Sequence, residues 1–212
     1  MSDTPNAMSA EFFDATYSRN DDPWGFETRW YEKRKRAVTL AALPAERYSN
    51  ALEIGSSIGV LTQALAERVD AILAVDISQA AVDRTRERLA GAAAAAAVAV
   101  TVERVDVAEN FPDGQYDLVL LSEVGYYFSE DGLDRVLAGI RDSLTENGTV
   151  VACHWRHPVS DYPVSGDDVH RTLAAFALGA GWSLIAYHLE ADFVLDVYSR
   201  NPNSVAETTG LL

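Results

Sequence analysis

Short apolar runs alternate with segments of helical spacing along most of this 212-residue chain, and no other feature restricts its fold as strongly. Strands are expected at residues 51–54, 71–75, 98–102, 116–121 and 149–153. Helices are expected between them at residues 60–68, 79–90 and 130–144, and the alanine-rich residues 91–97 should pass from a helix end into a loop. Repeated units of this kind are typical of α/β proteins, in which crossover helices cover a parallel sheet.

The pattern changes after Cys153. A helix is expected at residues 167–178, and the apolar runs 182–189 and 193–198 that follow it are separated by only three residues. So short a connection has no room for a crossover helix, so the last two strands should be antiparallel. The predicted fold class is α/β, with a Rossmann-like, seven-stranded, mostly parallel sheet that ends in a C-terminal antiparallel hairpin.

Three regions are expected along the chain. Residues 1–46 are rich in aromatic side chains and should form a helical N-terminal extension, with helices at residues 10–18 and 28–43. This extension either adds a packing layer at one edge of the sheet or acts as a lid over a ligand site. The main domain should cover residues 47–200, and the polar, aperiodic residues 201–212 should form a flexible tail.

Composition excludes several functional classes. Seventeen basic and 32 acidic residues give a net charge of −15, which would repel a phosphate backbone, so no nucleic-acid partner is expected. We expect no membrane segment and a cytoplasmic location, because the chain has neither a basic, apolar leader nor a bilayer-length apolar stretch. Its single cysteine cannot form an internal disulfide. Composition leaves the oligomeric state open.

The strongest chemical motif is the turn at residues 51–59, which ends a strand and opens a helix. Gly55 and Gly59 would let a ligand approach the backbone, and free amides at the helix start would favour a negatively charged group. Asp76 ends the next strand, where a carboxylate can accept from both hydroxyls of a ribose. Asp106 follows the third strand. Together these residues predict a site for an adenosine-containing ligand.

The turn lacks the Gly-x-Gly-x-x-Gly spacing of dinucleotide enzymes, because Ser57 stands between Gly55 and Gly59. It resembles motif I of class I methyltransferases that use S-adenosylmethionine. With the segments Asp-Asp-Pro-Trp at 21–24, Trp-Tyr-Glu-Lys-Arg-Lys at 30–35, Leu-Ser-Glu-Val-Gly-Tyr-Tyr at 121–127 and His-Trp-Arg-His-Pro at 154–158, it resembles the NodS-like family. Members of that family methylate a free amine on chitooligosaccharides.

This resemblance implies a role for each matching residue. The methionine end of the S-adenosylmethionine pocket would be shaped by Glu53, Gly55, Ser56 and Gly59. The ribose and adenine would be held by Asp76 and Ile77, and the adenine amino edge would meet Asp106 and Val107. The far wall would be formed by Ser122. Arg29 offers a fork of donors for the cofactor carboxylate, or is simply an exposed helix charge. The aromatic face of Trp24 could lie near the cofactor sulfonium.

The expected reaction is direct methyl transfer to a neutral amine of a small molecule, such as a deacetylated chitooligosaccharide. Glu123 and His154, at the ends of the fourth and fifth strands, could accept the amine proton or orient the amine. Small-molecule O-methylation and a non-catalytic cofactor-binding module are the alternatives. Two rivals fail on position: the Tyr31 and Lys35 pair precedes the glycine turn, unlike that of a short-chain dehydrogenase, and His154 with His157 lacks a third zinc ligand.

Overall fold

The fold is a seven-stranded sheet with the strand order β3-β2-β1-β4-β5-β7-β6. The computed structural model describes residues 7–96 and 98–212. The strands are β1 (Tyr48–Ile54), β2 (Val69–Asp76), β3 (Ala99–Arg104), β4 (Tyr116–Ser122), β5 (Leu144–Trp155), β6 (Ser183–Leu189) and β7 (Phe193–Ser199). Strands β1 to β5 are parallel, and β7 runs antiparallel to both β5 and β6. The predicted fold class is confirmed.

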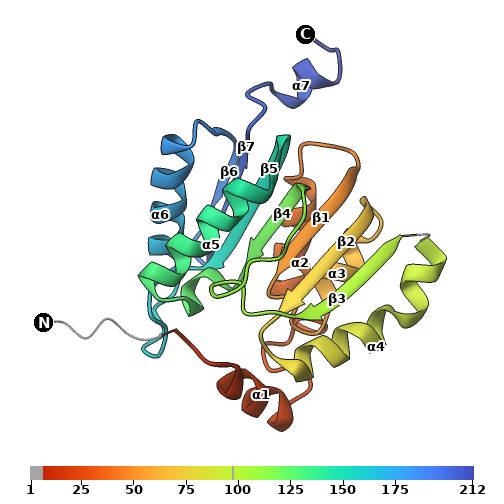
Figure 1. Ribbon diagram of the computed structural model, residues 1–212, viewed down its shortest axis with the longest axis vertical. Helices are drawn as coiled ribbons and strands as arrows, with labels where there is room; N and C mark the ends of the chain where they lie inside the picture. Colours follow the sequence, from red (N-terminus) through yellow and green to blue (C-terminus); the bar gives the residue numbers. More distant parts are fainter. Residues whose placement is uncertain (1–6, 97) are drawn as a thin grey trace, which may run out of the picture.

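Strand β1 lies between β2 and β4, so the chain leaves β1 in one direction along the sheet and later returns on its other side. In open α/β sheets such a reversal leaves a crevice at the carboxyl ends of the strands, and ligands bind there. Figure 1 shows the carboxyl ends of the parallel strands, drawn as arrowheads, on the same side of the sheet, next to α1 (Ala10–Arg19).

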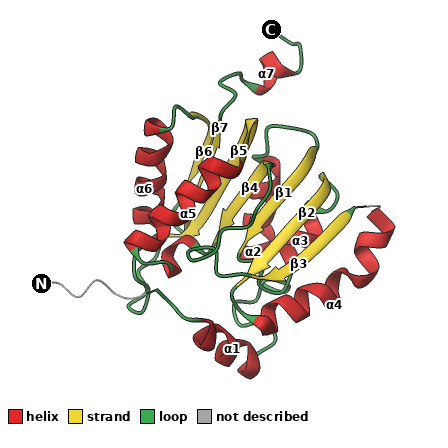
Figure 2. Cartoon of the chain, viewed as in Figure 1, coloured by secondary structure: helices red, strands yellow, loops and turns green. Residues whose placement is uncertain are grey.

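Helices cover both faces of the sheet (Figure 2). One face carries α5 (Glu130–Ser143) and α6 (Gly166–Gly179), and the other carries α2 (Trp30–Ala41), α3 (Val60–Leu65) and α4 (Gln79–Ala96). Strand side chains alternate between the two cores, because successive residues of a strand point to opposite faces. Leu52 and Ile54 therefore pack under α5, whereas Ala51 packs on the opposite side.

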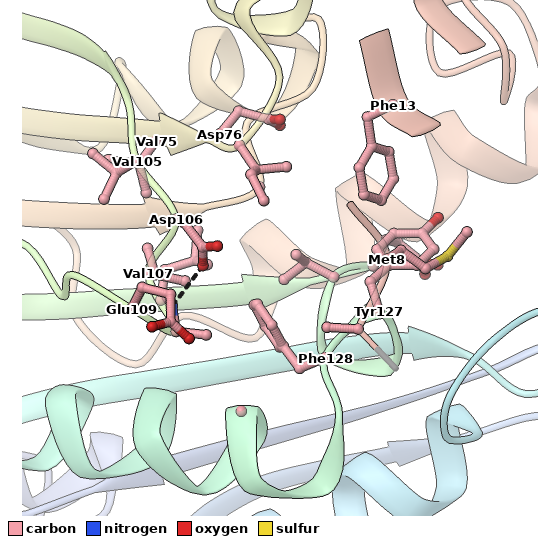
Figure 3. Close-up of a pocket in the computed structure, with 18 of the residues that line it drawn as sticks. Met8, Phe13, Val75, Asp76, Val105, Asp106, Val107, Glu109, Tyr127 and Phe128 are labelled. Atoms are coloured by element: carbon pink, nitrogen blue, oxygen red, sulfur yellow. Dashed lines mark hydrogen bonds between the residues drawn. The ribbon is translucent and has the colours of Figure 1, made fainter. Parts of the chain in front are cut away.

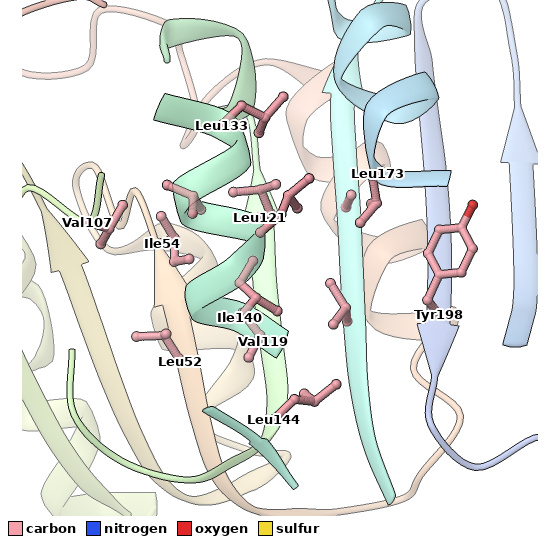
Figure 4. Close-up of a cluster of buried hydrophobic side chains, with 14 of the residues drawn as sticks. Leu52, Ile54, Val107, Val119, Leu121, Leu133, Ile140, Leu144, Leu173 and Tyr198 are labelled. Carbon is pink, nitrogen blue, oxygen red and sulfur yellow. The ribbon is translucent and has the colours of Figure 1, made fainter. Parts of the chain in front are cut away.

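The core under α5 and α6 is continuous and mostly aliphatic, with a minority of aromatic side chains such as Tyr198 (Figure 4). Leu133, Leu137 and Ile140 recur at helical spacing on α5 and are buried against β1 and β4. Ser129 starts this helix by accepting a hydrogen bond from the Gly132 amide. Burying one such aliphatic side chain contributes about 1.5–3 kcal/mol. This packing fixes the segment between β4 and α5, which borders the site described below.

Two element boundaries differ from the sequence expectation. Strand β5 begins at Leu144, earlier than the expected residue 149, but residues 145–148 have no partner on β4, because the register jumps from the Tyr116–Leu144 pair to the Leu118–Thr149 pair. Helix α4 continues through Ala96 instead of ending near residue 90, which fits the high helix propensity of alanine. Ala97 lies outside the described residues.

The two ends of the chain differ from each other. The N-terminal extension forms α1 and α2, as predicted, although Met1–Asn6 lie outside the described residues. The tail is not irregular throughout, because α7 (Val205–Thr208) forms one turn with a capping box between Ser204 and Glu207. In the part of the chain that the structure describes, no helix combines the length and apolar character needed to span a membrane.

Candidate functional site

A cavity of about 130 Å³ lies at the carboxyl ends of β1, β2 and β4. Seven predicted site residues line it: Trp24, Gly55, Asp76, Ile77, Asp106, Val107 and Glu123. Figure 3 shows Asp76 and Asp106 on one side of this cavity and Phe13, Met8 and Tyr127 across from them. Residues from distant parts of the chain therefore meet where the sheet topology leaves a crevice.

Asp76 is held by the backbone around it. Its two carboxylate oxygens accept hydrogen bonds from the Ser57 and Ser78 amides, each at 2.9 Å. Burial raises the pKa of Asp76 to about 6, and these amides only partly offset the effect. Each oxygen can accept a further hydrogen bond, so Asp76 remains able to bind two neighbouring hydroxyls of a ligand.

The far side of the cavity is largely apolar. Ile77 follows Asp76 directly, and Val107 and Phe128 line the same space. Asp106 lies at this end, where one of its oxygens accepts from the Ala108 amide at 3.1 Å. Glu109 also lines this end, and an apolar slot with carboxylates at its edge suits a flat ring that carries an amino group.

Four backbone amides of the glycine turn that precedes α3 already donate hydrogen bonds within the protein. The Gly55 and Ser56 amides donate to the Val75 carbonyl at 2.8 and 3.0 Å, and the Ser57 amide donates to Asp76. The Gly59 amide donates to the Ser56 carbonyl. These four groups cannot cradle a phosphate, so the turn shapes the cavity without binding an anion through them.

Gly55 and Gly59 have left-handed backbone conformations, with φ of +80° and +75°. A side chain on Gly55 would press against Val124, across the cavity wall. Gly59 lines neither cavity described here; instead, its Cα faces Thr85 of α4, and a Cβ would come within 2.9 Å of that side chain. The predicted ligand role of Gly59 is therefore replaced by close packing of α3 on α4.

A second cavity adjoins the first, since Gly55, Ser57 and Glu123 line both. The predicted residues Glu53, Ser56 and Ser122 lie here. A carboxylate oxygen of Glu53 and the Ser56 hydroxyl are buried, and neither has a hydrogen-bond partner among the described residues. Burial raises the pKa of Glu53 to about 8. Because unpaired buried polar groups are costly, this cavity suits a ligand that supplies polar partners.

Arg29 was predicted to meet a ligand carboxylate, and the structure contradicts this. The residue precedes α2, is exposed and lines neither cavity. Arg36, two helical turns further along, lines the second cavity and donates to the Phe26 carbonyl at 3.2 Å. The sequence contains four basic residues between 33 and 36, so only the orientation of α2 decides which of them faces the site.

Glu123 follows β4 and lies at the junction of the two cavities, in a left-handed conformation with φ of +57°. Its carboxylate accepts from the ammonium of Lys35 at 2.9 Å and from the hydroxyl of Tyr126. Lys35 also pairs with Glu32 at 2.9 Å. Burial opposes the charge on Lys35, but the two carboxylates outweigh it and raise the pKa of the ammonium.

His154 does not reach the site. Its side chain is fully buried, lines neither cavity, and accepts a hydrogen bond from the Gly125 amide at 3.0 Å. Burial, with His170 and Lys35 nearby, lowers the pKa of its imidazole well below the ordinary value. The predicted contact between His154 and a substrate is therefore contradicted, because β7 and α6 enclose the end of β5.

The N-terminal extension closes one side of the first cavity. Phe13 and Tyr17 of α1 and Trp24 line it, and the Tyr17 hydroxyl lies 2.6 Å from the Ser57 hydroxyl. The Met8 amide donates to the Tyr127 carbonyl at 2.9 Å. Sequence analysis missed Phe13 as a lining residue, since its helical spacing is also that of plain packing.

Across residues 7–96 and 98–212, no group of three or more His, Cys, Asp or Glu side chains is placed to hold an ion. His157, which belonged to the rejected zinc alternative, is exposed, and its Nε2 lies within hydrogen-bond distance, 2.8 Å, of a carboxylate oxygen of Asp192.

Comparison with known proteins places this architecture among the methyltransferases. A family described as "Methyltransferase domain" matches residues 52–150. Nodulation protein S of Rhizobium tropici is 31% identical over 120 residues, which cover 56% of this chain and 48% of that protein. Nodulation protein S of Bradyrhizobium diazoefficiens is 30% identical over 111 residues, or 52% and 51% of the two chains. The chain thus spans about half the length of the curated relatives it matches.

Solved structures agree with this. A candidate methyltransferase from Pseudomonas syringae is 38% identical, with a TM-score of 0.68, over 81% of this chain and 99% of that one. N-methyltransferase NodS from Bradyrhizobium japonicum WM9, in complex with S-adenosyl-l-homocysteine, has a TM-score of 0.71 over 92% of this chain and all of that one; at 19% identity it shows the shared fold. The chain therefore belongs to the methyltransferase family, with Nodulation protein S among its relatives.

Proposed function

We propose that this protein is an S-adenosylmethionine-dependent methyltransferase that methylates a free amine of a small molecule. The observation that carries the proposal is the pair of adjoining cavities, one lined by Asp76 and Ile77 and the other by the unpartnered Glu53 and Ser56. When bound, S-adenosylmethionine supplies a methyl group already activated by the positive sulfur, so the protein needs no covalent intermediate.

The residues present fit the parts of this cofactor. In the first cavity, Asp76 would accept from the two ribose hydroxyls, and Ile77 and Val107 would flank the adenine ring. In the second, Glu53 would accept from the α-ammonium group, which gives its buried oxygen a partner. Arg36 would pair with the α-carboxylate, the role that the sequence had given to Arg29.

A dinucleotide fits less well. Its pyrophosphate would need free backbone amides at the glycine turn. The amides of Gly55, Ser56 and Ser57 already donate within the protein. S-adenosylmethionine carries no phosphate, so nothing in it requires those donors.

For the acceptor, Glu123 is the residue we place nearest the transferred methyl group, because it borders both cavities. Lys35 and Tyr126 fix the direction of its carboxylate, which would attract and orient an amine. The ring centroids of Tyr126, Tyr127 and Tyr162 lie within 4.9 Å of one another, and Tyr127 is the one of the three that lines the first cavity, where it would meet a sugar or a cation. An amine needs a free electron pair to attack, so the rate should rise with pH through the bound amine's pKa.

We propose a deacetylated chitooligosaccharide as the acceptor. Its ammonium groups suit a chain with a net charge of −15, whereas a carboxylate or phosphate acceptor would be repelled. The similarity to Nodulation protein S covers about half of this chain. It supports this acceptor class because the NodS-like resemblance in the sequence implies methylation of a free amine on a chitooligosaccharide.

The test compares methyl transfer from labelled S-adenosylmethionine to fully acetylated and fully deacetylated chitotetraose, with products identified by mass spectrometry. We expect N-methylated product from the deacetylated sugar alone. Transfer only to hydroxyl compounds would replace the proposal with small-molecule O-methylation. Cofactor binding without transfer to any amine or hydroxyl would instead indicate a non-catalytic binding module.

A further inference from the structure

A chain of buried polar groups crosses the core behind the Glu123 wall of the first cavity. The Gly125 amide donates to Nε2 of His154 at 3.0 Å, Nδ1 of His154 lies 3.0 Å from Nε2 of His170, and Nδ1 of His170 lies 2.7 Å from an Asp196 oxygen. The two imidazoles and the carboxylate are at most 6% exposed. Three separate elements, β5, α6 and β7, supply them.

The hydrogen-bond pattern allows one arrangement of protons. Because Nε2 of His154 accepts from Gly125, a neutral His154 carries its proton on Nδ1 and donates it to His170. His170 then accepts at Nε2, carries its proton on Nδ1 and donates to Asp196. Asp196 accepts only, so it fixes the tautomer of both imidazoles and leaves Nε2 of His154 as the acceptor.

The Gly125 amide, which this series of hydrogen bonds holds, belongs to the segment that lines the first cavity. Gly125 begins the short 3-10 helix Gly125–Tyr127, and Glu123, Val124 and Tyr127 around it line the first cavity. The backbone approaches the imidazole closely, since a Cβ on Gly125 would come within 2.8 Å of Nε2 of His154. The left-handed conformation of Glu123, two residues before, needs such support to persist.

We propose that His154 is a positioning residue that holds the Gly125 amide, and through it Glu123 and Tyr127, with His170 and Asp196 fixing its tautomer. That the segment from Glu123 to Tyr127 matters for cofactor binding rests on the proposed function. The assignment replaces the earlier expectation that His154 accepts a proton, because its one free nitrogen lone pair is already used by the backbone.

The first test uses the unmodified protein. Nitrogen-15 NMR of the histidine rings should show His154 protonated on Nδ1, bare on Nε2, and unchanged over about pH 5 to 8, the window in which an ordinary histidine titrates. A proton on Nε2, or titration of His154 in that window, would overturn the proposal.

The second test separates a hydrogen-bond acceptor from a proton acceptor. Gln can present an oxygen where His presents Nε2, whereas Leu cannot. We expect His154→Leu to weaken S-adenosylhomocysteine binding roughly tenfold and to speed exchange of the Gly125 amide hydrogen, and His154→Gln to restore both to near the unmodified values. The matched control is the same pair of substitutions at His157, an exposed histidine three residues away, which should change neither readout.

The outcomes remain distinguishable from those of the proposed function. Unchanged Gly125 exchange in a folded His154→Leu protein overturns the positioning role. Failure of the unmodified protein to bind S-adenosylhomocysteine overturns the proposed cofactor, while the ring tautomers and Gly125 exchange still decide the role of His154. If His154→Leu does not fold, the tautomer measurement on the unmodified protein decides it.

Discussion

At the scale of single residues, Asp76 has the most specific position in the site. It accepts hydrogen bonds from two backbone amides and would accept two more from the ribose hydroxyls. Each hydrogen bond to a charged acceptor contributes about 1.5–3 kcal/mol. We therefore expect Asp76→Ala to weaken S-adenosylhomocysteine binding by at least about 100-fold in a calorimetric titration.

The control for this substitution is Asp134→Ala, which removes an exposed carboxylate from α5 and should leave affinity unchanged. Thermal unfolding of both variants separates lost binding from lost folding, because Asp76 also anchors Ser57 and Ser78. Affinity equal to that of the unmodified protein in folded Asp76→Ala would remove Asp76 from the site.

Glu53 makes the stability of the ligand-free protein depend on pH. Burial raises the pKa of its carboxyl from 4.5 to about 8, so between these values the folded state binds more protons than the unfolded state. Stability therefore falls as pH rises through this window and levels off above it. Glu53→Gln removes the titrating group. We therefore expect the melting temperature of this variant, relative to that of the unmodified protein, to increase as pH rises from 5 to 8.

The measurement is a series of thermal melts of both proteins across that window. A difference in melting temperature that stays constant with pH would show that Glu53 is not the group responsible. Acidic residues such as Asp167, whose pKa is lowered by its bond to Arg156, affect stability only at lower pH and are common to both proteins.

At the scale of elements, the turn between β1 and α3 depends on Gly55. A branched residue there meets two obstacles, a φ of +80° and a Cβ position only 3.0 Å from Val124. We expect Gly55→Val to abolish measurable S-adenosylhomocysteine binding and to lower the melting temperature. Normal binding by this variant would place the site elsewhere.

The N-terminal extension gives a prediction about motion. Helix α1 is held to the cavity by the Tyr17 bond to Ser57 and by packing of Phe13 on Tyr127, with ring centroids 4.9 Å apart. We expect this segment to act as a lid that bound cofactor stabilises, so S-adenosylhomocysteine should slow limited proteolysis around residues 21–25. Equal cleavage with and without the ligand would leave only a packing role.

The elements themselves were largely predictable from sequence, for a physical reason. An apolar run followed by helical spacing reports burial on the sheet, and this periodicity is local. The errors fell where local signals compete with longer-range pairing. Leu144 pairs with Tyr116 of β4 and so starts β5 early, while the Asn-Gly pair at residues 147 and 148 lies in the irregularity before Thr149 pairs with Leu118.

At the scale of the whole molecule, the site was predictable only in part. Asp76, Asp106 and Glu123 follow strands, and parallel strands bring their carboxyl ends together whatever covers the sheet. The choice of Arg36 over Arg29 depends on how α2 packs against the sheet, and the burial of His154 depends on α6 and β7. These are contacts between distant segments, which no local pattern reports.

The central claim is that the two adjoining cavities form one site for S-adenosylmethionine. The most direct measurement is a calorimetric titration of the purified protein with S-adenosylmethionine, S-adenosylhomocysteine and NAD in parallel. We predict saturable binding of the first two with a stoichiometry of one per chain and no binding of NAD, because the amides of Gly55, Ser56 and Ser57 at the glycine turn already donate within the protein. Binding of NAD alone would contradict this account.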